Sequence, residues 1–227
     1  MRVILVGCEY VGTTTLAYAI DDWLEVNMGV RFSLIHDHWK IPHTSGHPDD
    51  STTEEQAWLL AATPKFKEMH QRHSLYYHVQ ANTFIGHDDG MVIGGAIEDG
   101  VYGPMYFGYG DKDHRLNREM VQHQWERTIL HFTEETVLVH VTATSEVIAH
   151  RLRNDPHENM VISEEDIDKV KSRFAELVDW SVLNKKIEVD NSGSIETTLA
   201  DFVSKIEPYF SNVDRSRMKA HHQLQQK

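Results

Sequence analysis

Short apolar runs alternate with longer stretches of helical spacing along most of the 227-residue chain. The first run, Arg2–Val6, ends in a glycine and is typical of a buried parallel strand. Similar runs predict four further strands, at 31–36, 91–97, 136–141 and 186–189. Because strands that alternate with helices form parallel sheets with right-handed crossovers, we expect a three-layer α/β/α fold around a five-stranded parallel sheet.

Apolar residues at helical spacing predict helices between these strands. In the first of them Leu16, Ile20 and Leu24 share one face, and Gly29 marks its end. The predicted helices cover 14–27, 51–62, 65–85, 115–132, 145–152, 163–178 and 194–209, with cap pairs Ser51/Glu54 and Ser163/Asp166. The final stretch, 212–227, is polar and rich in glutamine and histidine, so we expect a frayed, partly disordered tail.

Composition narrows the possible partners. The formal charge is −13, from 35 acidic and 22 basic residues, without a dense lysine and arginine run. Such a surface repels nucleic acid polymers, whereas a small phosphorylated ligand needs only a few N–H groups and arginines. The single cysteine, Cys8, fits a reducing cytosol, and no apolar stretch approaches the roughly 20 residues that cross a bilayer. We therefore expect a cytoplasmic protein that does not span a membrane.

The most informative motif lies between the first predicted strand and the first predicted helix. It reads Gly7-Cys8-Glu9-Tyr10-Val11-Gly12-Thr13-Thr14 and fits the phosphate-loop pattern G-x-x-x-x-G-K-[ST] at every position but one. The glycines let the backbone N–H groups face inward, and the helix N-terminus adds positive partial charge. The residues expected to hold a triphosphate are Gly7, Glu9, Tyr10, Val11, Gly12, Thr13, Thr14 and Thr15. The Mg²⁺-binding hydroxyl belongs at Thr14, or one position further at Thr15.

The position that departs from the pattern is Thr13, which stands where the lysine belongs. A threonine hydroxyl donates a hydrogen bond but brings no charge, which is a serious loss in an electrostatically driven phosphoryl transfer. Three interpretations remain open. Another cation enters the site, from Lys65, Lys67, Arg151 or Arg153; the protein binds nucleotide and turns over slowly; or the loop is a structural turn without a ligand.

With this loop, and with motifs that follow it, the chain resembles the deoxynucleoside kinase and thymidylate kinase group of P-loop proteins from residue 2 to about 209. After the second strand, Ile35-His36-Asp37-His38-Trp39 is similar to the family's carboxylate and nearby tryptophan. The resemblance implies that Asp37 is the general base on a sugar hydroxyl and that Trp39 lines the sugar or base pocket. A carboxylate at the carboxyl end of a parallel strand suits that role chemically; the alternative is that Asp37 caps a turn.

Two further segments resemble the family's acceptor site. Tyr76-Tyr77-His78-Val79-Gln80 is similar to its aromatic-rich helix, which implies that Tyr77 and Gln80 contact a nucleobase; otherwise the tyrosines are core or interface residues. Glu98-Asp99-Gly100-Val101-Tyr102 follows the third strand, where the family has an acid, an arginine and an aromatic residue. The resemblance implies that Glu98 is catalytic and binds Mg²⁺, and that Asp99 and Tyr102 contact substrate, with Asp99 in the arginine's place. A solvated acidic turn is the alternative.

The segment Arg151-Leu152-Arg153 resembles the paired arginines of the family's lid, which implies one P-loop kinase-like domain over 1–211 with a lid at about 151–162. The two arginines lie about 200° apart on a continuous helix, so they do not share a face. We expect Arg151 at the phosphates as a catalytic residue and Arg153 on the adenine side of the cofactor.

These observations favour an ATP- and Mg²⁺-dependent kinase that phosphorylates a nucleoside or a nucleoside-like small molecule. The lost lysine and arginine keep a second hypothesis open, a regulatory protein that binds nucleotide with little or no kinase activity. A nucleoside monophosphate kinase is a further alternative, and an NTP-hydrolysing switch ranks lowest. The expected partner is a small nucleoside or nucleotide, and analogy with related kinases suggests a homodimer.

Overall fold

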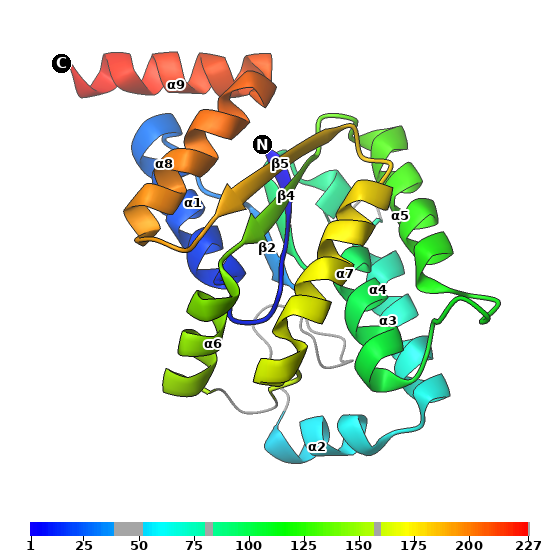
Figure 1. The fold of residues 1–227 in the computed structure, drawn as a ribbon. Helices are drawn as coiled ribbons and strands as arrows, with labels where there is room; N and C mark the ends of the chain where they lie inside the picture. Colours follow the sequence, from blue (N-terminus) through cyan, green and yellow to red (C-terminus); the bar gives the residue numbers. More distant parts are fainter. Residues whose placement is uncertain (39–51, 80–83, 157–159, 227) are drawn as a thin grey trace.

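The computed structural model describes residues 1–38, 52–79, 84–156 and 160–226. Its centre is a sheet of five parallel strands in the order β2-β3-β1-β4-β5, with β1 in the middle (Figure 1). The strands are β1 (Arg2–Val6), β2 (Leu34–Asp37), β3 (Gly90–Ile93), β4 (Val137–Thr142) and β5 (Lys185–Asp190). The five-stranded parallel sheet predicted from the sequence is therefore confirmed.

Helices cover both faces of the sheet (Figure 1). One face carries α1 (Thr13–Met28) and α8 (Ile195–Ile206), with α9 (Asn212–Gln225) packed across the end of α1. The other carries α3 (Pro64–His78), α4 (Ala96–Tyr102), α5 (Arg118–Phe132) and α7 (Ile167–Trp180), while α2 (Thr53–Ala61) and α6 (Ser145–Asn154) lie at one end. Single turns of 3₁₀ helix at Phe84–Gly86, Glu164–Asp166 and Glu207–Tyr209 and a π-helical turn at Gly103–Phe107 complete the described elements. No described helix is long and apolar enough to cross a membrane.

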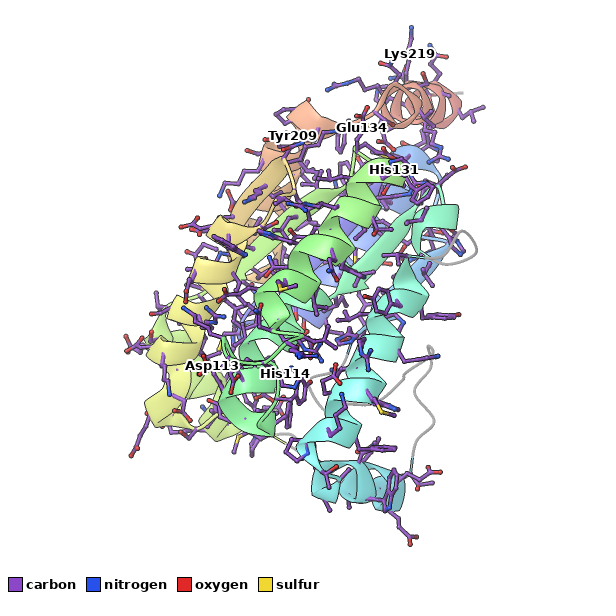
Figure 2. The ribbon with its side chains drawn as sticks, turned by 90° about the vertical axis from the view of Figure 1, so that its right-hand side faces the viewer. Asp113, His114, His131, Glu134, Tyr209 and Lys219 are labelled. Carbon is purple, nitrogen blue, oxygen red and sulfur yellow. The ribbon has the colours of Figure 1, made fainter. Side chains whose placement is uncertain are left out.

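The core lies where the apolar pattern places it. In β1, Val3, Leu5 and Val6 are fully buried, because the central strand is covered on both faces. Ile20 and Leu24 of α1 are equally inaccessible, which confirms the predicted helical face. Viewed from the side, α5 runs along the sheet from the turn that carries Asp113 and His114 to the turn that carries His131 and Glu134 (Figure 2).

Several boundaries differ from the prediction. Strand β2 starts at Leu34 rather than at 31, because the backbone N–H of Phe32 donates to the Asp21 carboxylate (2.8 Å) and keeps this stretch against α1. The capping box of α2 is Thr52 with Glu55, not Ser51 with Glu54. Helix α3 ends at His78 instead of continuing to 85.

The largest boundary error concerns the third strand, which ends at Ile93 rather than at 97. Gly94 and Gly95 follow with φ values of 88° and 74°, a left-handed conformation that only glycine adopts readily. The chain then enters α4 at once, so Glu98 and Asp99 lie in the first turn of a helix. The expectation that Glu98 and Asp99 directly follow a strand is therefore wrong, as is the alternative of a solvated acidic turn, and the helix fixes where each carboxylate points.

The tail expected to be frayed is a helix over its described part. Helix α9 begins with a capping box in which Ser211 and Asp214 satisfy each other's backbone N–H groups. The Asp214 carboxylate also accepts a hydrogen bond from the buried Met1 ammonium (3.2 Å), and Arg217 pairs with Asp89 (2.8 Å). These contacts join the helix to the start of β1, which a reading of polarity alone misses.

Acid is expected to weaken this attachment. Burial raises the pKa of the Asp214 carboxyl, but the Met1 ammonium and Ser211 outweigh burial and leave the pKa below its ordinary value of 3.8. A lowered folded-state pKa stabilises the protein above the ordinary value, and this contribution disappears as the pH falls through the folded-state pKa. Near neutral pH, Asp214→Asn should therefore lower the free energy of unfolding by about 1–2 kcal/mol, since it removes one charged hydrogen bond while the Met1 ammonium keeps its pair with Asp89 (2.6 Å).

Urea unfolding of both proteins over a pH series measures this difference, which should shrink below about pH 4. The control is Asp201→Asn, because Asp201 forms an exposed pair with Lys205 on α8 and should matter little at any pH. A difference that stays constant down to strongly acidic pH would contradict the ionic attachment.

Candidate functional site

The loop between β1 and α1 forms a tight cradle. Its turn is closed by the Val11 N–H, which donates to the Cys8 carbonyl (2.9 Å), and Tyr10 adopts a positive φ of 65°. Gly12 is the N-cap of α1 with φ 91°, and no side chain caps the helix there. A β-carbon at Gly7 would lie 2.5 Å from the Val141 carbonyl oxygen, so the loop needs glycine at both ends.

A cleft of about 510 Å³ opens in front of this loop. Its described lining comprises Gly7, Cys8, Glu9, Tyr10, Gly12, Thr13, Thr14, Thr15, Glu98, His150, Arg151, Asn154, Asp155, Asn191, Gly193 and Ile195. The first turn of α1 contains no acidic residue, and the first four N–H groups of a helix lack partners within it. The cleft therefore offers an uncapped helix N-terminus to an anionic group.

Two predicted site residues from distant parts of the chain meet beside the loop. The Thr14 hydroxyl donates to the Asp37 carboxylate (3.1 Å), because β2 ends beside the first turn of α1. The Glu98 carboxylate also lines the cleft and lies against Gly94, where any β-carbon would collide with it. Thr14 and Glu98 thus line the cleft, and Asp37 lies beside it through its contact with Thr14.

Of the four cations considered as substitutes for the missing lysine, Arg151 lines the cleft. Its Nη1 donates to the carbonyls of Tyr10 (3.2 Å) and Val11 (2.9 Å), and burial lowers its pKa from the ordinary value. Arg153 instead pairs with Glu164, as expected if the two arginines do not share a face. Lys65 pairs with Glu68, and Lys67 lies over the Phe107 ring, 5.6 Å from its centroid.

Two predicted contact residues support the loop from behind. The Glu9 carboxylate accepts hydrogen bonds from the N–H groups of Val161 and Ile162 (3.0 Å each). The Glu9 N–H donates to the hydroxyl of the buried Tyr102 (2.9 Å). Glu9 therefore joins the loop to the end of the expected lid, and Tyr102 lies beneath the loop rather than in the cleft.

The remaining substrate candidates do not gather at the cleft. Asp99 is buried against Arg118, 2.8 Å from its Nε, and accepts a hydrogen bond from Tyr109 (2.7 Å). Burial raises the pKa of Asp99, although Arg118 and Tyr109 act in the opposite direction. Tyr77 is half exposed on α3. Trp39 and Gln80 lie outside the described residues, as do 157–159 of the expected lid.

The residue missed by sequence reasoning is Asn191, which follows β5 directly. Its side-chain N–H donates to the Val11 carbonyl (2.7 Å), on the outer side of the phosphate loop. A signal existed, because the carboxyl ends of parallel strands meet at one edge of the sheet, where ligands bind. The prediction used that rule for β2 but not for β5.

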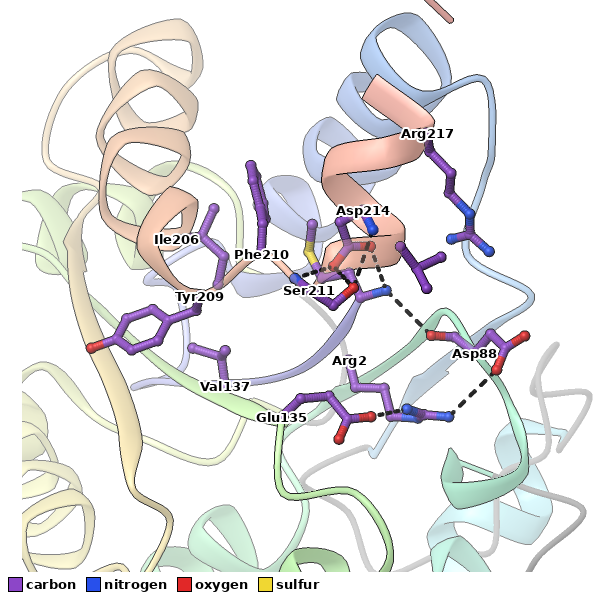
Figure 3. Close-up of a pocket in the computed structure, with 12 residues that line it drawn as sticks. Arg2, Asp88, Glu135, Val137, Ile206, Tyr209, Phe210, Ser211, Asp214 and Arg217 are labelled. Carbon is purple, nitrogen blue, oxygen red and sulfur yellow. Dashed lines mark hydrogen bonds and ion pairs between the residues drawn. The ribbon is translucent and has the colours of Figure 1, made fainter. Parts of the chain in front are cut away.

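A second cavity, of about 360 Å³, lies at the other end of the sheet, where β1 and β4 begin (Figure 3). The charged groups around it neutralise one another: Arg2 pairs with Asp88 and Glu135, and the Met1 ammonium pairs with Asp214. Because the chemical features of the phosphate loop are far from this cavity, we take the cleft as the candidate site.

Within the described ranges, no group of three or more His, Cys, Asp and Glu side chains is arranged to hold a metal ion. A metal at the cleft would thus need ligands beyond these side chains.

Comparison with known proteins shows which solved structures share this fold. No family model and no curated protein matches the chain. Among solved structures, a deoxyadenosine kinase from M. mycoides with bound dATP has a TM-score of 0.59 at 10% identity, covering 91% of this chain and all of the other. The YorR protein from Bacillus subtilis, in complex with phosphorylated GDP, has a TM-score of 0.56 at 18% identity, covering 93% of this chain and all of the other. Shikimate kinase from Bacteroides thetaiotaomicron has a TM-score of 0.53 at 13% identity, covering 91% of this chain and 98% of the other. The chain therefore has the α/β fold found in small-molecule kinases.

Proposed function

We propose that this protein binds ATP with Mg²⁺ and transfers the γ-phosphoryl group to a hydroxyl of a nucleoside or a nucleoside-like small molecule. The observation that carries the proposal is the contact between the Thr14 hydroxyl and the Asp37 carboxylate beside the uncapped start of α1. It brings a hydroxyl suited to Mg²⁺ and a carboxylate suited to a general base within one hydrogen bond of each other.

The cradle fits a triphosphate. Gly7 and Gly12 leave no room for side chains, because β-carbons there would meet Val141 and Asn191, and the N-terminus of α1 favours negative charge. Thr14 and Glu98 would hold Mg²⁺ together with phosphate oxygens and water, which is consistent with a site poor in protein ligands. The ion would neutralise charge on the transferring group.

Asp37 would act on the acceptor. Its carboxylate takes the proton of the acceptor hydroxyl while that oxygen forms a bond to the γ-phosphorus and the bond to the β-phosphate oxygen breaks, which releases ADP. Arg151 supplies positive charge beside the loop, where its Nη1 donates hydrogen bonds to the Tyr10 and Val11 carbonyls. Because Arg151 is engaged in these contacts, it compensates only in part for a lysine at position 13.

The missing positive charge at position 13 favours a second candidate function, a nucleotide-binding regulatory protein with little or no kinase activity. Incubation with ATP, Mg²⁺ and a panel of nucleosides and nucleoside monophosphates distinguishes the candidates. A phosphorylated nucleoside supports the proposal, whereas a product formed only from monophosphates moves the acceptor to that class. Thermal stabilisation by ATP without any product leaves the regulatory protein. The absence of both contradicts both functions.

Restoring the lysine should strengthen nucleotide binding. Thr13→Lys adds a charge-assisted hydrogen bond at the cleft, and we expect the Kd for ATP to fall about tenfold or more in isothermal titration calorimetry. The control is Tyr18→Lys, which adds the same charge at an exposed position of α1 outside the cleft lining. An unchanged affinity in Thr13→Lys would argue against phosphates at this loop, and equal gains in both variants would indicate general attraction only.

A further inference from the structure

We propose that Asn191 is a positioning residue that aims the Gly12 N–H of the phosphate loop at the bound phosphate. The inference rests on the function proposed above and assigns part of it to a residue that belongs to no part of the loop motif. It starts from the Val11 carbonyl, which accepts two hydrogen bonds from outside the loop, from Asn191 Nδ2 (2.7 Å) and Arg151 Nη1 (2.9 Å).

The direction of that carbonyl determines the direction of the next N–H. In a trans peptide, the C=O of one residue and the N–H of the next point in opposite directions. Asn191 and Arg151 fix the Val11 oxygen on their own side, so the Gly12 N–H points away from both of them. The neighbouring Val11 N–H is already used, because it donates to the Cys8 carbonyl. Gly12 thus provides the next N–H after Val11, directly before the helix begins.

Asn191 is itself fixed in this orientation. It is 4% exposed, and its backbone N–H donates to the Thr142 carbonyl (2.7 Å) at the end of β4. Its side-chain oxygen accepts a hydrogen bond from the buried Thr198 hydroxyl (2.8 Å), and its own carbonyl accepts one from Arg151 (2.8 Å). Since the Val11 oxygen can only accept, the amide nitrogen must face it. The orientation of the side-chain amide therefore follows from its two partners.

The amide also explains why Gly12 must be glycine. A β-carbon at position 12 would lie 2.5 Å from Asn191 Nδ2, in addition to the strain that φ 91° imposes on any other residue. The loop and the β5–α8 turn are therefore in direct contact. Asn191 touches the backbone of the loop and acts on the ligand through Gly12.

The test uses the full chain and two ligands, ATP with Mg²⁺ and inorganic tripolyphosphate, which lacks the nucleoside. In Asn191→Ala we expect the Kd of both to rise by about tenfold, the size of one lost hydrogen bond. In Asn191→Asp the loss should be larger, because a carboxylate would face the Val11 oxygen. The melting temperature of each variant is measured alongside.

The control is Ser194→Ala, which removes the N-cap of α8 in the same turn without touching the loop. It should lower the melting temperature and leave both Kd values unchanged. If Ser194→Ala weakens binding as much as Asn191→Ala, or if Asn191→Ala binds tripolyphosphate like the wild type, the positioning role is overturned. Wild-type protein that binds neither ligand would contradict the proposed function itself, which separates the two failures.

Discussion

Replacement of Asp37 by asparagine is expected to lower the rate of phosphoryl transfer by about 10²–10⁴-fold while ATP binding stays close to that of the wild type. Asparagine has nearly the same shape and can still accept the hydrogen bond from Thr14, so the end of the cleft keeps its geometry. It cannot take the proton of the acceptor hydroxyl. The loss therefore appears in kcat, with little change in the Kd for ATP.

Single-turnover measurements with saturating ATP and acceptor report the rate directly. The matched control is Asp155→Asn, which removes a carboxylate from another part of the same cleft and should change the rate by no more than a few-fold. An Asp37→Asn protein that phosphorylates the acceptor at the wild-type rate would show that Asp37 is not the base. The alternative that Asp37 caps a turn would then be preferred, because its contact with Thr14 would be structural.

Replacement of Arg118 by methionine is expected to lower the free energy of unfolding by about 3–5 kcal/mol. Arg118 is 1% exposed and lies between two buried carboxylates, 2.8 Å from Asp99 and 3.5 Å from Glu68. It also lies over the Tyr109 ring, 4.9 Å from its centroid. Removing its charge leaves Asp99 buried without a cation, which is the costly way to break a buried pair.

Thermal unfolding should show this as a fall of about 10 °C in melting temperature, at about 2–4 °C per kcal/mol for a chain of this size. Arg173→Met is the control, since Arg173 is a partly exposed arginine with two acidic partners and its loss should cost at most about 1 kcal/mol. The double variant Arg118→Met with Asp99→Leu should recover much of the stability, because it removes both charges. A single variant as stable as the wild type would show that the buried network contributes nothing.

The fold was largely predictable because its signals are local. The runs that form β1 and β4 are apolar at nearly every position, as a strand buried on both faces requires, and the loop glycines mark the change from strand to helix. The errors arose where distant residues decide the structure. Asp21 holds Phe32 out of β2, and the Met1 ammonium holds the start of α9 in addition to the local capping box of that helix. Neither contact can be read from neighbouring positions.

The site was predictable in part, for the same reason. The loop motif and the strand-end position of Asp37 are visible in sequence. The structure brings Thr14, Glu98 and Arg151 to one cleft, and Asp37 contacts Thr14 beside it. Asp99 was misread because two successive glycines turn the chain into α4 and direct its carboxylate to Arg118. Asn191 was missed because its partner, the Val11 carbonyl, is a backbone atom that leaves no trace in the motif.

The anchors of the phosphate loop also determine when it becomes competent during synthesis. The loop leaves the ribosome well before its anchors, because Arg151 follows Val11 by 140 residues and Asn191 follows it by 180. At common elongation rates of about 5–20 residues per second, the second anchor emerges roughly 10–40 s after the loop. Until then the Val11 carbonyl lacks at least one of its two partners, and β1 becomes the central strand only once β3 and β4 have been synthesised. A nascent chain therefore gains both anchors of the loop only after residue 191 has emerged.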